Sequence, residues 1–127
     1  MNKEDLKDKI SKASYIVTQE HGTEAPFSGE LLDTKEEGIF TCVCCGNELF
    51  SSDTKYDSGT GWPSFWDVLN ENSVGEEIDK SHGMIRTEVH CQKCNAHLGH
   101  LFPDGPMPTG KRYCMNSVAM QFKKSDK

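Results

Sequence analysis

Two Cys-x-x-Cys pairs are the residues of this chain whose type and spacing point most directly to chemistry. The first pair is Cys42 and Cys45, and the second is Cys91 and Cys94. A two-residue spacer lets both sulfurs of a pair converge on one ion, and two such pairs supply the four soft ligands of a tetrahedral zinc site. Because a closed shell leaves no position open for water, the spacing predicts a structural Zn²⁺.

Other uses of these cysteines stay open in the sequence. The same pairs would form disulfides in a secreted protein, although nothing in the chain marks secretion. His97 or His100 could replace one cysteine as a ligand. Cys44 lies inside the first pair, but Cys44 and Cys45 as neighbouring ligands would strain the site. We therefore interpret Cys44 as a bystander thiol.

The sixth cysteine, Cys114, stands outside both pairs and is the candidate for catalysis. It falls within a strand predicted over Lys111–Phe122. The period of two in a strand puts Arg112, Cys114 and Asn116 on one face. A guanidinium beside a thiol favours the thiolate, which is the nucleophilic form, and an asparagine can hydrogen-bond its neighbours. The pattern predicts an activated thiol.

Two histidines and an aspartate precede this strand, at His97, His100 and Asp104. A cysteine, a histidine and an orienting polar group are the usual combination for a thiol nucleophile. A hairpin-like return from His100 to Cys114 would bring them together. Taken alone, however, a cysteine on a strand is more often a small buried hydrophobe, and Trp62 in a Gly/Pro loop is more often a packing residue.

The elements that must position these residues are mostly short strands. A charged segment with an i, i+4 apolar stripe predicts one or two short surface helices near the N-terminus, and Gly/Pro-rich stretches predict the loops. The expected helices lie within Lys3–Gln19, a strand–turn–strand unit over Gly38–Phe50, a further strand over Ile85–Cys91, and loops over 57–63 and 101–110. The fold class predicted from this is mainly β.

Bulk composition narrows the class of protein. With 127 residues the chain is expected to be one domain, 1–127, with a helical segment over about 3–20 and a catalytic β domain over about 21–122. A net charge of −6 argues against nucleic-acid binding. The charged start and the lack of a long apolar run predict no signal peptide, no membrane span and a cytoplasmic location.

Six runs of residues, spread nearly end to end along the chain, form a specific set. They are Tyr15–Thr18, Gly22–Phe27, Cys42–Phe50, Tyr56–Phe65, His97–Pro106 and Arg112–Ser117, of which the last two are the most specific. In these runs the chain resembles a known family, the peptide-methionine (R)-S-oxide reductases, or MsrB family, in its zinc-containing form.

The resemblance implies a fold of two antiparallel β-sheets, with the zinc away from the active site. It implies an oxidoreductase that reduces the R epimer of methionine sulfoxide, free or in proteins, and so repairs oxidised protein. Its partners would be oxidised proteins and a thioredoxin-type reductant, with neither nucleic acid nor membrane. A monomer is the default expectation.

The resemblance also implies roles for individual residues. Cys114 attacks the sulfoxide sulfur and is left as a sulfenic acid. His100 is favoured as the general acid, because a histidine can protonate the departing oxygen near neutral pH, and His97 lies close behind. Supporting and substrate-binding roles fall to Arg112, Asn116, Asp104 as the orienting group for the histidines, Trp62 as the wall of a methyl-binding box, and Phe65.

One position departs from the family pattern. Many members carry a resolving cysteine where this chain has Thr60, and a threonine cannot form a disulfide with Cys114. Direct reduction of the sulfenic acid by an external thiol is favoured, with Cys44 as the internal alternative. A zinc module that binds a protein partner without catalysis is the rival function, and it would need neither Cys114 nor Arg112.

Overall fold

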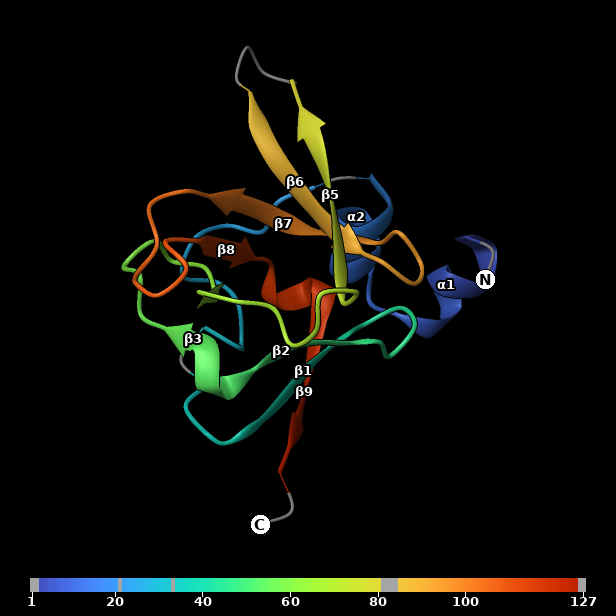
Figure 1. Ribbon diagram of the computed structural model, residues 1–127. Coiled ribbons are helices and arrows are strands. Elements are labelled where there is room, and N and C mark those ends of the chain that lie inside the picture. Colours follow the sequence, from blue (N-terminus) through green and yellow to red (C-terminus); the bar gives the residue numbers. More distant parts are fainter. Residues whose placement is uncertain (1–2, 21, 33, 81–84, 126–127) are drawn as a thin grey trace.

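The computed structural model describes residues 3–20, 22–32, 34–80 and 85–125, and Figure 1 shows the arrangement of its elements. Two short helices precede a set of short strands. The helices are α1 (Lys3–Lys9) and α2 (Lys12–Glu20), with 3₁₀ turns η1 (Ser52–Thr54) and η3 (Ser117–Ala119). The strands are β1 (Gly38–Cys42), β2 (Glu48–Ser51), β3 (Lys55–Tyr56), β4 (Ser64–Phe65), β5 (Val74–Asp79), β6 (Arg86–Cys91), β7 (His97–Phe102), β8 (Arg112–Met115) and β9 (Met120–Lys124).

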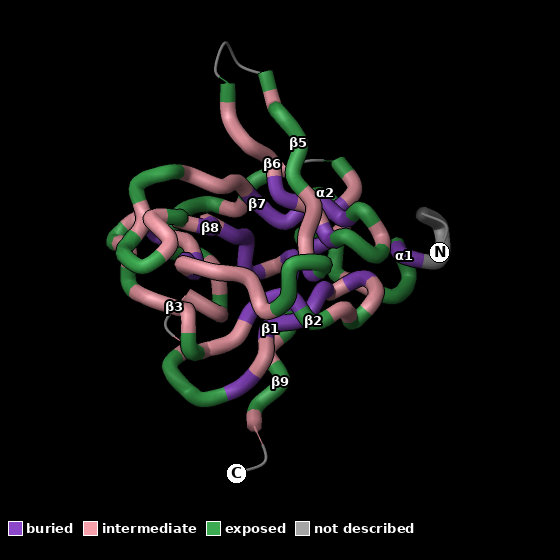
Figure 2. The backbone as a smooth tube through the Cα atoms, viewed as in Figure 1, coloured by how far each residue is buried: buried purple, intermediate pink, exposed green. Residues whose placement is uncertain are grey.

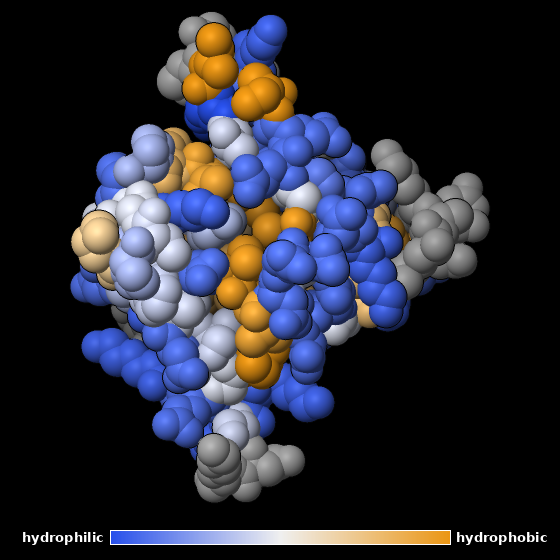
Figure 3. Space-filling view, viewed as in Figure 1, coloured by the Kyte–Doolittle hydropathy of each residue, from blue (hydrophilic) through white to orange (hydrophobic). Residues whose placement is uncertain are grey.

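The strands form two antiparallel sheets, as the fold-class prediction expected. The smaller sheet has the order β2-β1-β9, and the larger has the order β3-β4-β8-β7-β6-β5. In the larger sheet β5 and β6 form a hairpin that projects from the body of the molecule (Figure 1). Figure 3 shows hydrophobic side chains at its projecting end, where Ile78 and Ile85 are among the exposed large hydrophobic residues.

The predicted N-terminal helices are confirmed, and the second one has a buried face. The Ser11 hydroxyl accepts a hydrogen bond from the Ser14 N–H at 3.1 Å, which caps the start of α2. Val17 and Thr18 are buried where α2 lies against β7 and η3. Within the described ranges, no helix combines the length and apolar character needed to cross a membrane.

Aromatic side chains join the two sheets. The Phe50 ring of β2 stacks on the Phe65 ring of β4, with centroids 4.3 Å apart, and the Phe40 ring of β1 meets Phe65 edge-on at 5.0 Å. All three rings are fully buried, and the buried stretches in Figure 2 lie where the sheets approach each other. Stacked and edge-on aromatic pairs are worth about 0.5–1.5 kcal/mol beyond their buried area. This core holds the larger sheet, and hence the site below, in place.

The last predicted strand is wrong as one element. The segment expected as a continuous strand over Lys111–Phe122 is two strands, β8 and β9, that belong to different sheets. The turn η3 separates them, closed by a hydrogen bond from the Ala119 N–H to the Asn116 carbonyl at 3.1 Å. The loop expected from Leu101 begins only after Phe102, because β7 continues to that residue.

Candidate active site and metal centre

Cys114 lies in the middle of the larger sheet, between two neighbouring strands. It is the cross-strand partner of His100 on β7 and of Ser64 on β4. Side chains of directly opposed residues leave the same face of a sheet, about 4.5–5.5 Å apart at their Cβ atoms. The strand pairing therefore brings Cys114 and His100 together, as the expected hairpin-like return required.

The Cys114 side chain lines a small cavity of about 100 Å³. Residues from five separate segments of the chain surround it. The lining residues are Thr23, Trp62, Arg86, Gly99, His100, Phe102, Cys114 and Asn116. Cys114 is partly exposed, so a small substituent entering the cavity can reach its sulfur. The site thus combines an accessible thiol with two aromatic walls, which are Trp62 in the loop before β4 and Phe102 at the end of β7.

The ionisation of Cys114 differs from the expectation that the neighbouring Arg112 makes the thiolate its favoured form. Burial raises the pKa of the Cys114 thiol, and Glu24 raises it further, while Thr60 and Arg112 lower it without reversing the net shift. Removing a thiol from water penalises its charged form. The resting side chain is therefore a protonated thiol, and the guanidinium alone does not overcome the desolvation.

His100 is held by a carboxylate that the sequence did not indicate. Its Nε2 lies 3.2 Å from Asp79 Oδ2, and the same oxygen accepts a hydrogen bond from Arg86 at 3.2 Å. Burial lowers the pKa of His100, whereas Asp79 raises it in part. The imidazole is therefore neutral at pH 7. A donated Nε2–H to Asp79 would leave Nδ1 as the basic nitrogen.

His97 lies behind His100, outside the lining of the cavity. The two imidazole rings are 5.5 Å apart at their centroids in an edge-on arrangement. His97 is buried, and its Nδ1 lies 3.0 Å from Glu88 Oε1. The carboxylates beside the two histidines are thus Asp79 and Glu88, which come from the β5–β6 hairpin.

Asp104 has a different partner from the one expected. Its carboxylate oxygens accept hydrogen bonds from Arg112 Nε at 2.8 Å and from a terminal guanidinium nitrogen at 3.2 Å. The guanidinium also lies over the Phe102 ring, 4.3 Å from its centroid. The expectation that Asp104 orients the histidines is therefore wrong in its partner, because Asp104 fixes the position of Arg112 instead.

Glu24 connects Trp62 and Asn116, two site residues that are far apart in the sequence. Its carbonyl accepts a hydrogen bond from the Trp62 indole at 3.0 Å, and its N–H donates to Asn116 Oδ1 at 2.9 Å. The Asn116 amide in turn donates to the Leu98 carbonyl at 2.9 Å. Glu24 lies in the Gly22–Phe27 run, but nothing local in that run indicates this contact.

Phe65 does not reach the cavity. It is fully buried in the aromatic core, and its ring is covered by Phe50. The expectation that Phe65 binds substrate is corrected by this burial, since the two-sheet packing uses the ring. The aromatic residues that line the cavity are Trp62 and Phe102. Phe102, Thr23 and Arg86 line it although no sequence pattern indicated them.

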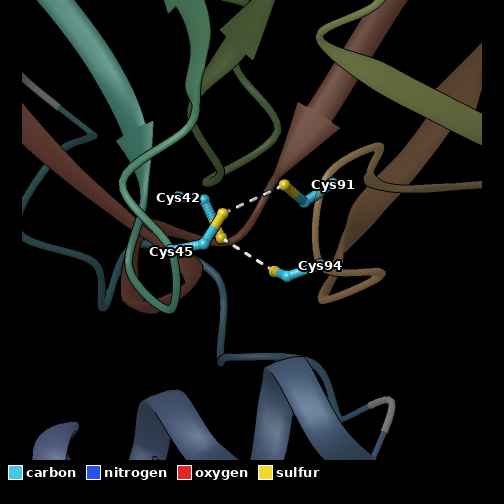
Figure 4. Close-up of side chains that lie close together, drawn as sticks. All are labelled: Cys42, Cys45, Cys91 and Cys94. Carbon is cyan, nitrogen blue, oxygen red and sulfur yellow. Dashed lines mark hydrogen bonds between the residues drawn. The ribbon is translucent and has the colours of Figure 1, made fainter. Parts of the chain in front are cut away.

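The two Cys-x-x-Cys pairs converge at a separate point of the molecule (Figure 4). One sulfur from each residue of Cys42, Cys45, Cys91 and Cys94 lies within 4.8 Å of the other three, so the four could hold one metal ion. The two turns are built alike. The residues after the pairs, Gly46 and Asn95, have positive φ angles of 79° and 64°, and each donates its N–H to the first cysteine's carbonyl.

The sulfur spacing fits a tetrahedral metal better than disulfides. Cys42 and Cys94 Sγ are 3.6 Å apart, as are Cys45 and Cys91 Sγ. A disulfide needs about 2.05 Å. Sulfurs bound at about 2.3 Å around one tetrahedral ion are about 3.8 Å apart. Cys44 is buried, with its sulfur 3.6 Å from Gln19 Nε2, outside this group of four.

Comparison with known proteins gives consistent results. The SelR domain model matches residues 10–124. A peptide methionine sulfoxide reductase MsrB of Hahella chejuensis is 54% identical over 123 residues, covering 97% of this chain and 88% of the relative. An Escherichia coli protein of the same name is 55% identical over 119 residues, covering 94% and 87%. The solved Mis18 "Yippee-like" domain shares the fold, with a TM-score of 0.57 and 20% identity over 72% of this chain and 100% of that one.

Proposed function

This chain belongs to the SelR domain family as an MsrB-type oxidoreductase, a peptide methionine sulfoxide reductase, and we propose that it reduces the R epimer of methionine sulfoxide, free and in proteins. The observation that carries the proposal is the position of Cys114, partly exposed in a 100 Å³ cavity directly opposite His100. The rival function, a zinc module without catalysis, gives no reason for this pairing.

The proposed reaction transfers the sulfoxide oxygen to Cys114. The Cys114 sulfur attacks the sulfoxide sulfur while the oxygen gains a proton, and methionine then departs with an intact thioether. The S–S bond made by this attack and the S–O bond of the substrate both break as the hydroxyl moves to the Cys114 sulfur, which is oxidised by two electrons to a sulfenic acid while the substrate sulfur is reduced by two. One proton is needed on the oxygen, and the Cys114 thiol brings one to the site.

His100 can accept the proton of the Cys114 thiol and deliver a proton to the sulfoxide oxygen. Cys114 at rest is a thiol and His100 is a neutral imidazole, since burial raises the pKa of the first and lowers that of the second. Transfer of the thiol proton to His100 produces the nucleophilic thiolate and the general acid in one step. Asp79 stabilises the resulting imidazolium, while Arg112, held by Asp104, stabilises the thiolate.

The cavity also supplies a basis for recognising the substrate. Trp62 and Phe102 line it with aromatic surface suited to an S-methyl group. A volume of about 100 Å³ admits the end of a methionine side chain but little more. The two sulfoxide epimers have the same polarity, so discrimination between them depends on the shape of these walls and on where an oxygen can approach His100.

A thioredoxin-type dithiol is the reductant we propose. Thr60 has no thiol to resolve the sulfenic acid, and Cys44 is buried beside Gln19 on the turn that carries the first two metal ligands.

Zn²⁺ is the ion that we propose for the two Cys-x-x-Cys pairs, because four cysteine sulfurs are its usual structural ligand set. The setting we propose is protein repair after oxidative stress, in the cytoplasm and by a monomer.

Single-turnover reduction of separated R and S methionine sulfoxide tests the proposal. Wild-type protein without reductant is expected to form about one methionine per chain from the R epimer and none from the S epimer, with a sulfenic acid found by mass analysis at Cys114. Cys114→Ser should abolish this, and Cys44→Ser is the matched control that should not. Equal turnover of both epimers, or turnover by Cys114→Ser, would reject the assignment, and a stoichiometric Cys44–Cys114 disulfide would reject the direct route.

A further inference from the structure

Three hydroxyl side chains lie in a row beside Cys114 on the larger sheet and the loop before β4. Ser58 Oγ is 2.8 Å from Thr60 Oγ1 and 2.7 Å from Ser64 Oγ, and Ser64 is fully buried. Ser64 is the cross-strand partner of Cys114, and the Thr60 side chain is one of the groups that lower the pKa of that thiol. We propose that this chain, Ser64–Ser58–Thr60, stabilises the thiolate of Cys114, with Thr60 as the residue that donates to the reacting sulfur.

The backbone around the three hydroxyls holds them in this order. Ser64 is the cross-strand partner of Cys114, and the Met115 N–H donates to the Pro63 carbonyl at 2.9 Å, so the loop before β4 is fixed against β8. The Thr60 N–H also donates to Ser58 Oγ at 3.4 Å. The row therefore belongs to the strand pairing that positions the thiol.

The chain can serve both protonation states of Cys114 because each hydroxyl carries one rotatable proton. Ser64 donates to the Trp62 carbonyl at 3.2 Å. With the thiol present, Ser58 then donates to Ser64, Thr60 to Ser58, and the S–H to Thr60. With the thiolate present, Thr60 donates to sulfur, Ser58 to Thr60 and Ser64 to Ser58. Only the long bond to the Trp62 carbonyl is given up, in exchange for a charge-assisted bond to sulfur.

Charged and titratable groups face Cys114 from several other elements. Arg112 on β8 favours the thiolate. Glu24, in the segment between α2 and β1, opposes it, as does burial, which is the largest effect. His100 and Arg86 line the same cavity, and Tyr56 on β3 lies close enough to interact with the sulfur's charge. The proposal requires that Thr60 contributes in addition to these charges.

This inference assigns a role to the position where many family members have a resolving cysteine. It rests on Cys114 being the nucleophile of the proposed function, but its test does not use sulfoxide turnover. Alkylation of Cys114 by iodoacetamide across a range of pH, followed by mass mapping of its peptide, reports the thiolate directly. Near-ultraviolet circular dichroism and metal content verify that each variant is folded.

Thr60→Val, which keeps the shape and removes the hydroxyl, is expected to move the alkylation midpoint of Cys114 to higher pH. Thr60→Ser should restore the wild-type midpoint, and Ser58→Ala should give a smaller upward shift because Thr60 loses its partner. Thr34→Val, a matched change in the neighbouring groove, should have no effect.

An unchanged midpoint in Thr60→Val would overturn the proposal, and should that variant not fold, an unchanged midpoint in Ser58→Ala would do so. An equal shift in Thr34→Val would also overturn it, by showing that the loss of a threonine hydroxyl outside the row has the same effect on Cys114. If the shifts occur but no R sulfoxide is reduced, the hydroxyl chain stands and the proposed function fails. If R sulfoxide is reduced by a Thr60→Val protein with a wild-type midpoint, the function stands and this inference fails.

Discussion

Cys114 and His100 are direct cross-strand partners on β8 and β7, so the strand register itself places the thiol beside the imidazole. The same register puts Gly99 next to the pair, opposite Met115. Side chains fixed by a sheet ladder are more precisely held than side chains on loops. The chemistry proposed for the two residues therefore depends on how closely these two strands approach.

Removal of the metal is expected to loosen the junction of the two sheets. Cys42 ends β1 in the smaller sheet and Cys91 ends β6 in the larger, so an ion bound by both pairs connects the sheets. Cys91→Ser should lose the metal and lower the free energy of unfolding by several kcal/mol, because binding of a structural metal is coupled to folding. Metal analysis and urea denaturation measure this. Cys44→Ser is the control, and a Cys91→Ser protein with one metal per chain and full stability would contradict the assignment.

Asp79→Asn is expected to lower the pKa of His100 further. Burial already lowers that pKa, the Asp79 carboxylate raises it in part, and Arg86 opposes the imidazolium. The variant removes the supporting charge and leaves Arg86 without its ion-pair partner. Titration of the imidazole proton signals by NMR measures the change. Glu76→Gln, an exposed carboxylate of the same strand, is the control, and a His100 titration unaltered by Asp79→Asn would show that Asp79 does not support this histidine.

Local sequence patterns predicted some of these features and missed others for one physical reason. The Cys-x-x-Cys turns and the shared face of Arg112 and Cys114 follow from spacing within one turn or one strand. The partners of the histidines depend on the pairing of β6 with β5 and β7, which is a long-range register that local spacing does not contain. For the same reason Asp104 was paired with the wrong residues. The single-domain boundaries stay a prediction.

The break between β8 and β9 and the burial of Phe65 are further cases of this kind. A strand that continues and a strand that changes sheets have the same alternating pattern, and only the turn at η3 separates them. Phe65 lies in a family run together with Trp62, but the ring is used by the packing of one sheet on the other. Nearness in sequence to a site residue did not place it at the site.

Glu24→Gln is expected to affect both stability and the thiol. Burial raises the pKa of Glu24 above its ordinary value of 4.5, although the Val118 N–H partly opposes this. A raised carboxyl pKa favours the protonated form in the folded state, so its contribution to stability is present below the unfolded pKa and is lost as pH rises through the folded one. The Gln variant should therefore be more stable than wild type at pH 7, with the difference vanishing in acid.

The same variant should lower the pKa of Cys114, because the Glu24 charge opposes its thiolate. Urea denaturation at pH 4 and 7 and the alkylation midpoint of Cys114 measure the two effects. Glu30→Gln, an exposed carboxylate further along the same segment, should change neither. Lower stability of Glu24→Gln than of wild type at pH 7 would show that the carboxylate's hydrogen bond to Val118 outweighs the cost of burying its charge.

Gly99→Ala is expected to separate β7 from β8 at the proposed active site. A Cβ at this position would overlap the Cys114 carbonyl oxygen and would lie 2.9 Å from Met115 Cα, and neither backbone atom can move without shifting the strand. Overpacking of this kind costs roughly 1–3 kcal/mol. Urea denaturation should show this loss, and the movement of Cys114 away from His100 should slow single-turnover reduction of the R sulfoxide.

The control for this change is Gly110→Ala. Gly110 has a φ of +71° and no heavy atom within 4 Å of an added Cβ, so its substitution costs only the strain of a left-handed backbone, about 1–2 kcal/mol. Both variants should therefore lose stability, but only Gly99→Ala should slow the chemical step. Equal single-turnover rates in the two variants, at temperatures where both are fully folded, would show that reduction tolerates a wider gap between Cys114 and His100 than the strand register sets.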